Sequence, residues 1–146
     1  MWLRVLSFGI FALPITLIDL RELRVPDILS IGGIAVVSFL DAFLFHVSPG
    51  SIILQAGIGF GLFWAISVLT QGKLGLGDAK YSAFIALSVG LHAWLATLAV
   101  ASIAGLAVAL YLIKVHRAPR NMRIPFAPFL TLGAAVSFIM EHAAAG

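Results

Sequence analysis

The feature that most restricts the fold is a long stretch without any charged side chain, which runs from Tyr81 to Ile113. This stretch is longer than one membrane-spanning helix, which takes about 17–25 residues. The segment Gly90-Leu91-His92 interrupts it, so we expect two helices there. Because 62% of the chain is hydrophobic and only 10% is charged, a water-soluble fold of this size could not bury the apolar surface. The composition therefore predicts a protein embedded in a lipid bilayer.

Four further apolar stretches make up most of the rest of the chain. They cover residues 2–18, 28–45, 51–69 and 125–140. The first resembles a signal peptide, but no small-residue cleavage site follows it, so we expect a retained helix. We therefore predict an all-α, polytopic membrane protein with six transmembrane helices, forming a single domain over residues 1–146. Small residues at four-residue spacing predict close contacts between helices at two places: Gly57 with Gly61, and Ala101 with Gly105 and Ala109.

The basic residues gather in three of the polar connections between these helices. They are Arg21 and Arg24; Lys73 and Lys80; and Lys114, Arg117, Arg120 and Arg123. Of the nine Lys and Arg residues, only Arg4 lies elsewhere, and we expect its side chain to reach the outer interface. By the positive-inside rule, the three connections are cytoplasmic and both chain ends lie outside. The net charge of +3 therefore reflects topology, and we expect membrane lipid but no nucleic acid as a partner.

Two aspartates are predicted to meet at the cytoplasmic face. Asp19 ends the first helix and Asp78 begins the fourth. Two carboxylates held close together cannot both ionise easily, so the pair tends to share one proton. The ionised member can deprotonate a water molecule, and the protonated member can donate to a peptide carbonyl. This is aspartyl protease chemistry, which requires no metal ion and no cysteine.

Each aspartate also has a simpler interpretation. Asp78 could be the N-cap of the fourth helix, since Asp is among the best capping residues, with Gly75 and Gly77 forming a flexible turn. Alternatively, these glycines allow close backbone approach to an extended substrate strand. Asp19, at a helix C-terminus where the macrodipole disfavours an anion, could form a surface ion pair with Arg21 or Arg24.

The other polar residues offer weaker candidates. Asp41 lies inside the second helix towards its outer end, and we expect it to make a structural hydrogen bond to a neighbouring helix. Asp27 is placed to cap the second helix. Lys80 could lower the pKa of Asp78, orient a substrate or anchor the helix at the headgroups. The chain has no cysteine and its four histidines are scattered, so we expect no metal and no cofactor.

Three motifs resemble those of one known family, the type IV prepilin peptidases. They are Ile18-Asp19-Leu20-Arg21 through Arg24-Val25-Pro26-Asp27, then Gly75-Leu76-Gly77-Asp78-Ala79-Lys80, and Arg123-Ile124-Pro125-Phe126-Ala127-Pro128-Phe129-Leu130. The second is similar to the G-x-G-D motif of that family and the lysine that follows it. The resemblance implies a six-helix intramembrane aspartic endopeptidase with Asp19 and Asp78 as the catalytic pair. It further implies that Gly75, Gly77 and Lys80 are motif residues that contact the substrate.

The same resemblance implies the substrate and the location. The substrates are prepilins or pseudopilins, cleaved behind a basic leader at the cytoplasmic face of the bacterial inner membrane for pilus or secretion assembly. Larger members carry a cysteine-containing loop linked to N-methylation, which this chain lacks, so the resemblance is to the minimal form. The family also has Asn where this chain has Asp27. The alternative is a non-catalytic membrane subunit, such as a transporter component or an assembly scaffold.

Overall fold

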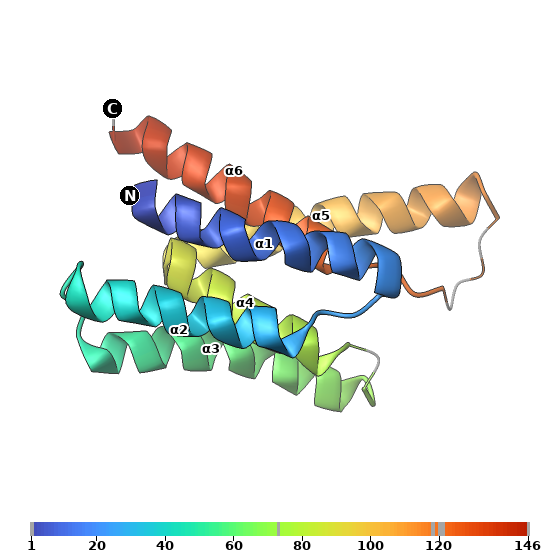
Figure 1. Cartoon of the computed structure of the whole chain (residues 1–146). Helices are drawn as coiled ribbons and strands as arrows, with labels where there is room; N and C mark the ends of the chain where they lie inside the picture. Colours follow the sequence, from blue (N-terminus) through green and yellow to red (C-terminus); the bar gives the residue numbers. More distant parts are fainter. Residues whose placement is uncertain (1, 73, 118, 120–121, 146) are drawn as a thin grey trace.

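The computed structural model describes the chain except for residues 1, 73, 118, 120–121 and 146. The described residues form six α-helices and no strand, so the all-α prediction is confirmed. The helices are α1 Trp2–Glu22, α2 Asp27–Phe43, α3 Pro49–Leu69, α4 Leu76–Val89, α5 Leu91–Lys114 and α6 Ala127–Ala145. Both ends of the chain lie at one end of the bundle, and the connections α1–α2, α3–α4 and α5–α6 lie at the other (Figure 1).

Helix α4 is the centre of the bundle. All of its residues from Tyr81 to Val89 are buried, and it contacts each of the other five helices. Its two buried serines are satisfied, because Ser88 donates to the Phe84 carbonyl at 2.8 Å and Ser82 accepts from the Trp94 indole at 3.0 Å. A helix that is enclosed on all sides needs no amphipathic pattern, and its polar groups require internal partners.

The tightest packing on α4 comes from α3. A Cβ added to Gly59 would lie 2.9 Å from the Ala83 Cα, so only glycine allows this approach. The prediction that Gly57 and Gly61 form the contact is wrong, because nothing lies within 4 Å of a Cβ at either position. On α5 the prediction is closer, since Ala101 is buried and Gly105 faces the rings of Phe129 on α6 and of Phe126, which directly precedes α6. Four-residue spacing indicated small-residue contacts but not which helix face makes them.

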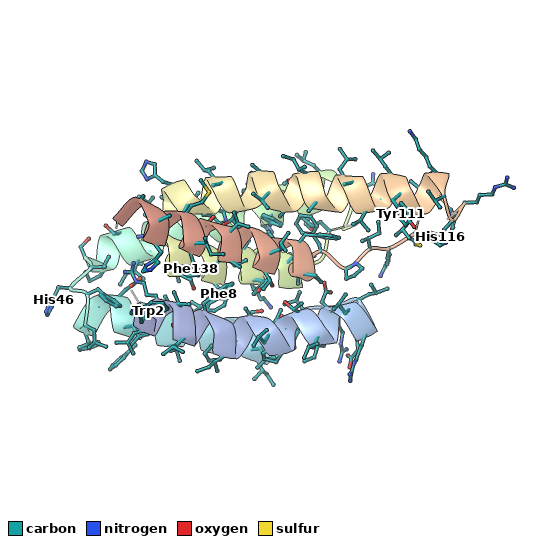
Figure 2. The ribbon with its side chains drawn as sticks, turned by 90° about the horizontal axis from the view of Figure 1, so that it is seen from above. Trp2, Phe8, His46, Tyr111, His116 and Phe138 are labelled. Atoms are coloured by element: carbon teal, nitrogen blue, oxygen red, sulfur yellow. The ribbon has the colours of Figure 1, made fainter. Side chains whose placement is uncertain are left out.

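Helices α1 and α6, which carry the two chain ends, pack together along their length. Phe8 and Phe138 point towards each other between them (Figure 2), with ring centroids 5.4 Å apart. Trp2 and His46 lie at the end of the bundle that holds the chain ends (Figure 2). Tyr111, near the end of α5, and His116, just after it, lie at the opposite end. The buried core draws residues from all six helices, and α1 and α4 carry the two predicted site residues.

Among the described residues, four helices are long and apolar enough to cross a membrane: α1, α3, α5 and residues Ala127–Ala144 of α6. Many large apolar side chains on the surface of the bundle are exposed, including Ile103 and Leu106 on α5. Lipid is the natural partner for such a surface. The chain is thus a multi-pass membrane protein. Helices α2 and α4 are shorter, at 17 and 14 residues.

Several helix ends differ from the sequence prediction. Helix α1 continues past Ile18 to Glu22, so Asp19 lies inside its last turn. Helix α4 begins at Leu76, which places Asp78 in its first turn. The predicted break after α4 is confirmed at Gly90, whose φ of 79° suits glycine. Polar side chains led to early predicted ends, but a helix can continue through them until its backbone hydrogen bonds end.

Candidate active site

Asp19 and Asp78 line the same pocket, at the end of the bundle opposite the chain termini. The pocket has a volume of about 550 Å³, within the usual range for small-molecule sites. Its walls come from the three connections and the helix ends beside them. The lining residues are Asp19, Leu23, Arg24, Val25, Gly72, Leu74, Gly75, Gly77, Asp78, Met122, Arg123, Ile124 and Phe126. The fold thus brings residues from three distant parts of the chain to one cavity.

Asp19 is held by the start of α6. Its side chain is only 3% exposed, and its Oδ2 accepts a hydrogen bond of 2.9 Å from the backbone N–H of Ala127, the first residue of α6. The positive end of the α6 dipole therefore compensates an anion that the C-terminus of α1 disfavours. The predicted ion pair is not seen among the described residues, where Arg24 binds Glu22 instead, at 3.0 Å.

Asp78 lies in the first turn of α4, outside the four candidate membrane spans. The N-cap of α4 is Gly75 rather than Asp78, and the Asp78 N–H donates to the Gly75 carbonyl at 3.1 Å. Burial, and then the nearby carboxylate of Asp19, raise the pKa of Asp78 to about 6, while a hydrogen bond with the Gly75 backbone partly opposes this rise. The two carboxyl groups are thus electrostatically coupled.

The two glycines of the G-x-G-D segment differ in their surroundings. A Cβ on Gly77 would lie 2.9 Å from both the Cβ and the carbonyl oxygen of Val25, so this glycine allows the α1–α2 connection to pack against α4. A Cβ on Gly75 would lie 3.6 Å from the Asp78 Oδ2 and 3.9 Å from the Gly77 nitrogen, which are ordinary contacts. The close approach at Gly77 is therefore made by the protein's own chain.

Lys80 points away from the pocket lining. Its Nζ lies 2.7 Å from the Asp27 Oδ2, and it is absent from the residues that line the cavity. Asp27 is the first residue of α2, and the cap position is Pro26, which makes no side-chain capping bond. The prediction that Asp27 caps α2 is therefore wrong. Its carboxylate is used for the ion pair with Lys80.

Three hydroxyl groups that the sequence reasoning missed lie one helical turn from the site. Tyr81 and Thr16 each share a hydrogen bond with the Thr131 hydroxyl, at 2.6 and 2.7 Å, and Thr131 donates to the Ala127 carbonyl at 2.9 Å. Thr16 precedes Asp19 by three residues and Tyr81 follows Asp78 by three. That spacing on a helix places them on the face of their aspartate, a signal the sequence did contain.

Asp41 lies at the other end of the bundle. Its carboxylate is 1% exposed and forms an ion pair with Arg4 of α1, and the Arg4 guanidinium lies 4.5 Å from the centroid of the Phe45 ring. The predicted structural hydrogen bond to a neighbouring helix is confirmed. Arg4 was expected to extend to the interface, but it is drawn to Asp41 instead. No group of three or more His, Cys, Asp or Glu residues able to hold a metal ion occurs within the described part of the chain.

This arrangement defines a class of protein: a multi-pass helical membrane protein with two coupled carboxyl groups in one pocket. A model of the type IV leader peptidase family matches residues 6–110. The match covers most of the chain and includes both pocket aspartates, so the chain belongs to this family. At the level of the family it is a type IV leader peptidase-like protease. No curated protein and no solved structure matched the chain.

Proposed function

We propose that the chain is an aspartic endopeptidase that removes the leader peptide of prepilin-like proteins, with Asp19 and Asp78 as its catalytic pair. The observation that supports this most is their shared position: both carboxyl groups line one pocket, and the charge of Asp19 contributes to the raised pKa of Asp78. Groups with perturbed pKa values in a cavity are typical of catalytic sites. Family membership supplies the reaction class.

The two carboxyl groups have unequal surroundings, which suggests their roles. Asp19 accepts a backbone N–H at the start of α6, and this hydrogen bond favours its ionised form. We assign the shared proton to Asp78, because the hydrogen bond from the start of α6 belongs to Asp19. Asp19 then takes a proton from a water molecule, whose oxygen attacks the scissile carbonyl carbon while Asp78 protonates the carbonyl oxygen. When the C–N bond breaks, Asp19 returns its proton to the leaving amine and Asp78 regains its own.

The short central helix gives the chemistry a wet position within the membrane. At about 1.5 Å per residue, the 14 residues of α4 span roughly 21 Å, less than the roughly 30 Å of hydrocarbon. The N-terminus of α4, with Asp78, is therefore recessed relative to longer neighbours such as α1, and a pocket remains above it. Six crossings with both termini outside would place this pocket at the cytoplasmic face of a bacterial inner membrane. There it would receive a leader and the apolar helix behind it.

Cleavage of a leader-bearing substrate in proteoliposomes tests this proposal. We expect Asp19→Asn and Asp78→Asn each to lower the rate by about 10³-fold or more, since general acid–base catalysis contributes roughly 10²–10⁴-fold per group. Glu22→Gln is the matched control, because Glu22 lies near Asp19 on α1 but is exposed and outside the pocket. Full activity in either Asn variant would refute the catalytic pair. A wild-type protein without cleavage would favour the non-catalytic subunit instead.

A further inference from the structure

The α1–α2 connection and the first residue of α2 contact the N-terminal part of α4 at two points. Gly77 packs against Val25, where a Cβ would lie 2.9 Å from the Val25 Cβ and carbonyl oxygen. Lys80 reaches the Asp27 carboxylate at 2.7 Å. These two contacts lie on either side of Asp78 in the sequence, and the docked segment begins four residues after Asp19. Both contacts therefore join a segment that is close to Asp19 in the sequence to a segment that is close to Asp78.

We propose that these contacts form a clamp that sets the position of Asp78 relative to Asp19, and that Lys80 is a positioning residue rather than a substrate ligand. The proposal rests on the proposed function, because it concerns the same pair of aspartates. The clamp comprises Gly77 with Val25 and Lys80 with Asp27.

The chain geometry makes the clamp effective. Only residues 23–26 separate the end of α1 at Glu22 from the start of α2 at Asp27, so a tie on Asp27 also restrains the last turn of α1. Lys80 has only 29% of its side chain exposed, and its stem is thus held by the bundle as well. A displacement of about 1 Å at a catalytic group can lower a rate by roughly 10²-fold, so a restraint of this kind matters to catalysis.

Asp27 is the first residue of α2, where the helix dipole favours its carboxylate. Lys80 is the fifth residue of α4, just past the first turn. The pairing therefore gives the Lys80 ammonium a carboxylate partner two residues after Asp78 in the sequence.

Kinetics of single and double variants test the clamp in the full-length protein. Lys80→Met keeps an apolar stem and removes the charge, and Asp27→Ala removes the partner. We expect each to lower kcat by about 10-fold to 100-fold with KM nearly unchanged, and the double variant to lose no more than the single ones, because all three break one interaction. Glu22→Gln, which breaks the exposed pair of Glu22 with Arg24, should leave both constants unchanged. A raised KM with unchanged kcat in Lys80→Met would overturn the clamp and favour substrate binding.

A second measurement requires no cleavage, so it separates failure of the clamp from failure of the proposed function. The chain has no cysteine, so spin labels on Leu20→Cys and Leu76→Cys report only on α1 and the first turn of α4. Both side chains are exposed and lie outside the pocket lining. The distance distribution between the labels should broaden or shift in Lys80→Met, Asp27→Ala and Gly77→Ala, and stay unchanged in Glu22→Gln. An unchanged distribution in all three clamp variants would overturn the proposal, whether or not the protein cleaves its substrate.

Discussion

Each end of the bundle buries a carboxylate, but the partners of the carboxylate differ between the two ends. At the end that holds the chain termini, Asp41 is neutralised by Arg4, whose guanidinium also lies over the Phe45 ring. At the other end, Asp19 accepts a backbone N–H from Ala127 and lines a pocket together with Asp78. One carboxylate is fixed by a cation from a neighbouring helix. The other is paired with a second acid beside a cavity.

This difference separates a structural tie from a reactive site. A guanidinium beside a buried carboxylate compensates its charge and holds two helices together. A carboxyl group next to another carboxyl group has a raised pKa and can exchange a proton near neutral pH. Burial of an acid in a membrane helix is therefore not enough to identify a catalytic residue. The partner of the acid, and the presence of a cavity, decide between the two interpretations.

The largest expected effect on stability comes from removing the cation that pairs with Asp41, at the end of the bundle that holds the chain termini. Arg4→Leu leaves Asp41 buried without its cation, which costs about 3–5 kcal/mol. For a protein of this size this lowers Tm by about 10 °C, measured in detergent by thermal unfolding. The double variant Arg4→Leu with Asp41→Leu should recover most of the loss, because an apolar pair suits this site.

Cleavage provides the control for the Arg4 variants. The rate per folded molecule should remain close to that of the wild type in both the single and the double variant, since Arg4 and Asp41 lie outside the pocket of Asp19 and Asp78. Loss of cleavage in a variant that is still folded would contradict the division into a structural end and a reactive end.

Much of the fold followed from the sequence. The uncharged stretch from Tyr81 to Ile113 predicted two helices broken near Gly90, and the structure has this break. Hydropathy locates apolar helices well because burial in lipid dominates their free energy. It does not locate helix ends as well. The first helix was predicted to end at Asp19 but continues to Glu22, because a helix end depends on backbone hydrogen bonds that hydropathy does not report.

The site was predicted only in part. The sequence singled out Asp19 and Asp78, and the structure places both at one pocket. The bond from Ala127 to Asp19 and the pairing of Lys80 with Asp27 were not foreseen. Both join residues that are distant in the sequence, and the charge pattern of a single chain allows many such pairs. Lys80 had three possible roles from its sequence position, and pairing with Asp27 was none of them.

The next largest effect is the pH dependence of stability that comes from Asp78, at the pocket end of the bundle. The pKa of Asp78 is about 6 in the folded protein against a usual value of 3.8, a difference worth at most about 3 kcal/mol. Because water screens a partly exposed group, we expect about 2 kcal/mol. The folded state binds the proton more tightly, so ionisation of Asp78 lowers stability as the pH rises from about 4 through 6. Asp78→Asn removes this penalty.

Asp78→Asn should therefore be more stable than the wild type at pH 7.5, and its advantage should shrink as the pH falls from 6 to 4. Unfolding midpoints across that pH range provide the measurement. Asp41→Asn is the matched variant with the opposite sign, since it leaves Arg4 without its carboxylate and should be less stable than the wild type at pH 7.5. An advantage of Asp78→Asn that does not change with pH would contradict the raised pKa of Asp78.

The smallest expected effect concerns how the reactive end is held together. Besides the ion pair of Lys80 with Asp27, it has the hydroxyl groups of Thr16, Tyr81 and Thr131, which join α1, α4 and α6. Tyr81→Phe removes one neutral hydrogen bond, while Thr131 keeps its bonds to Thr16 and to the Ala127 carbonyl. Because no buried group loses all of its partners, we expect a loss of about 1 kcal/mol in unfolding free energy and a modest decrease in kcat. A loss as large as that of Arg4→Leu would show that the hydroxyl groups act as one cooperative unit, and the contrast between a single strong tie and several weak ones would not hold.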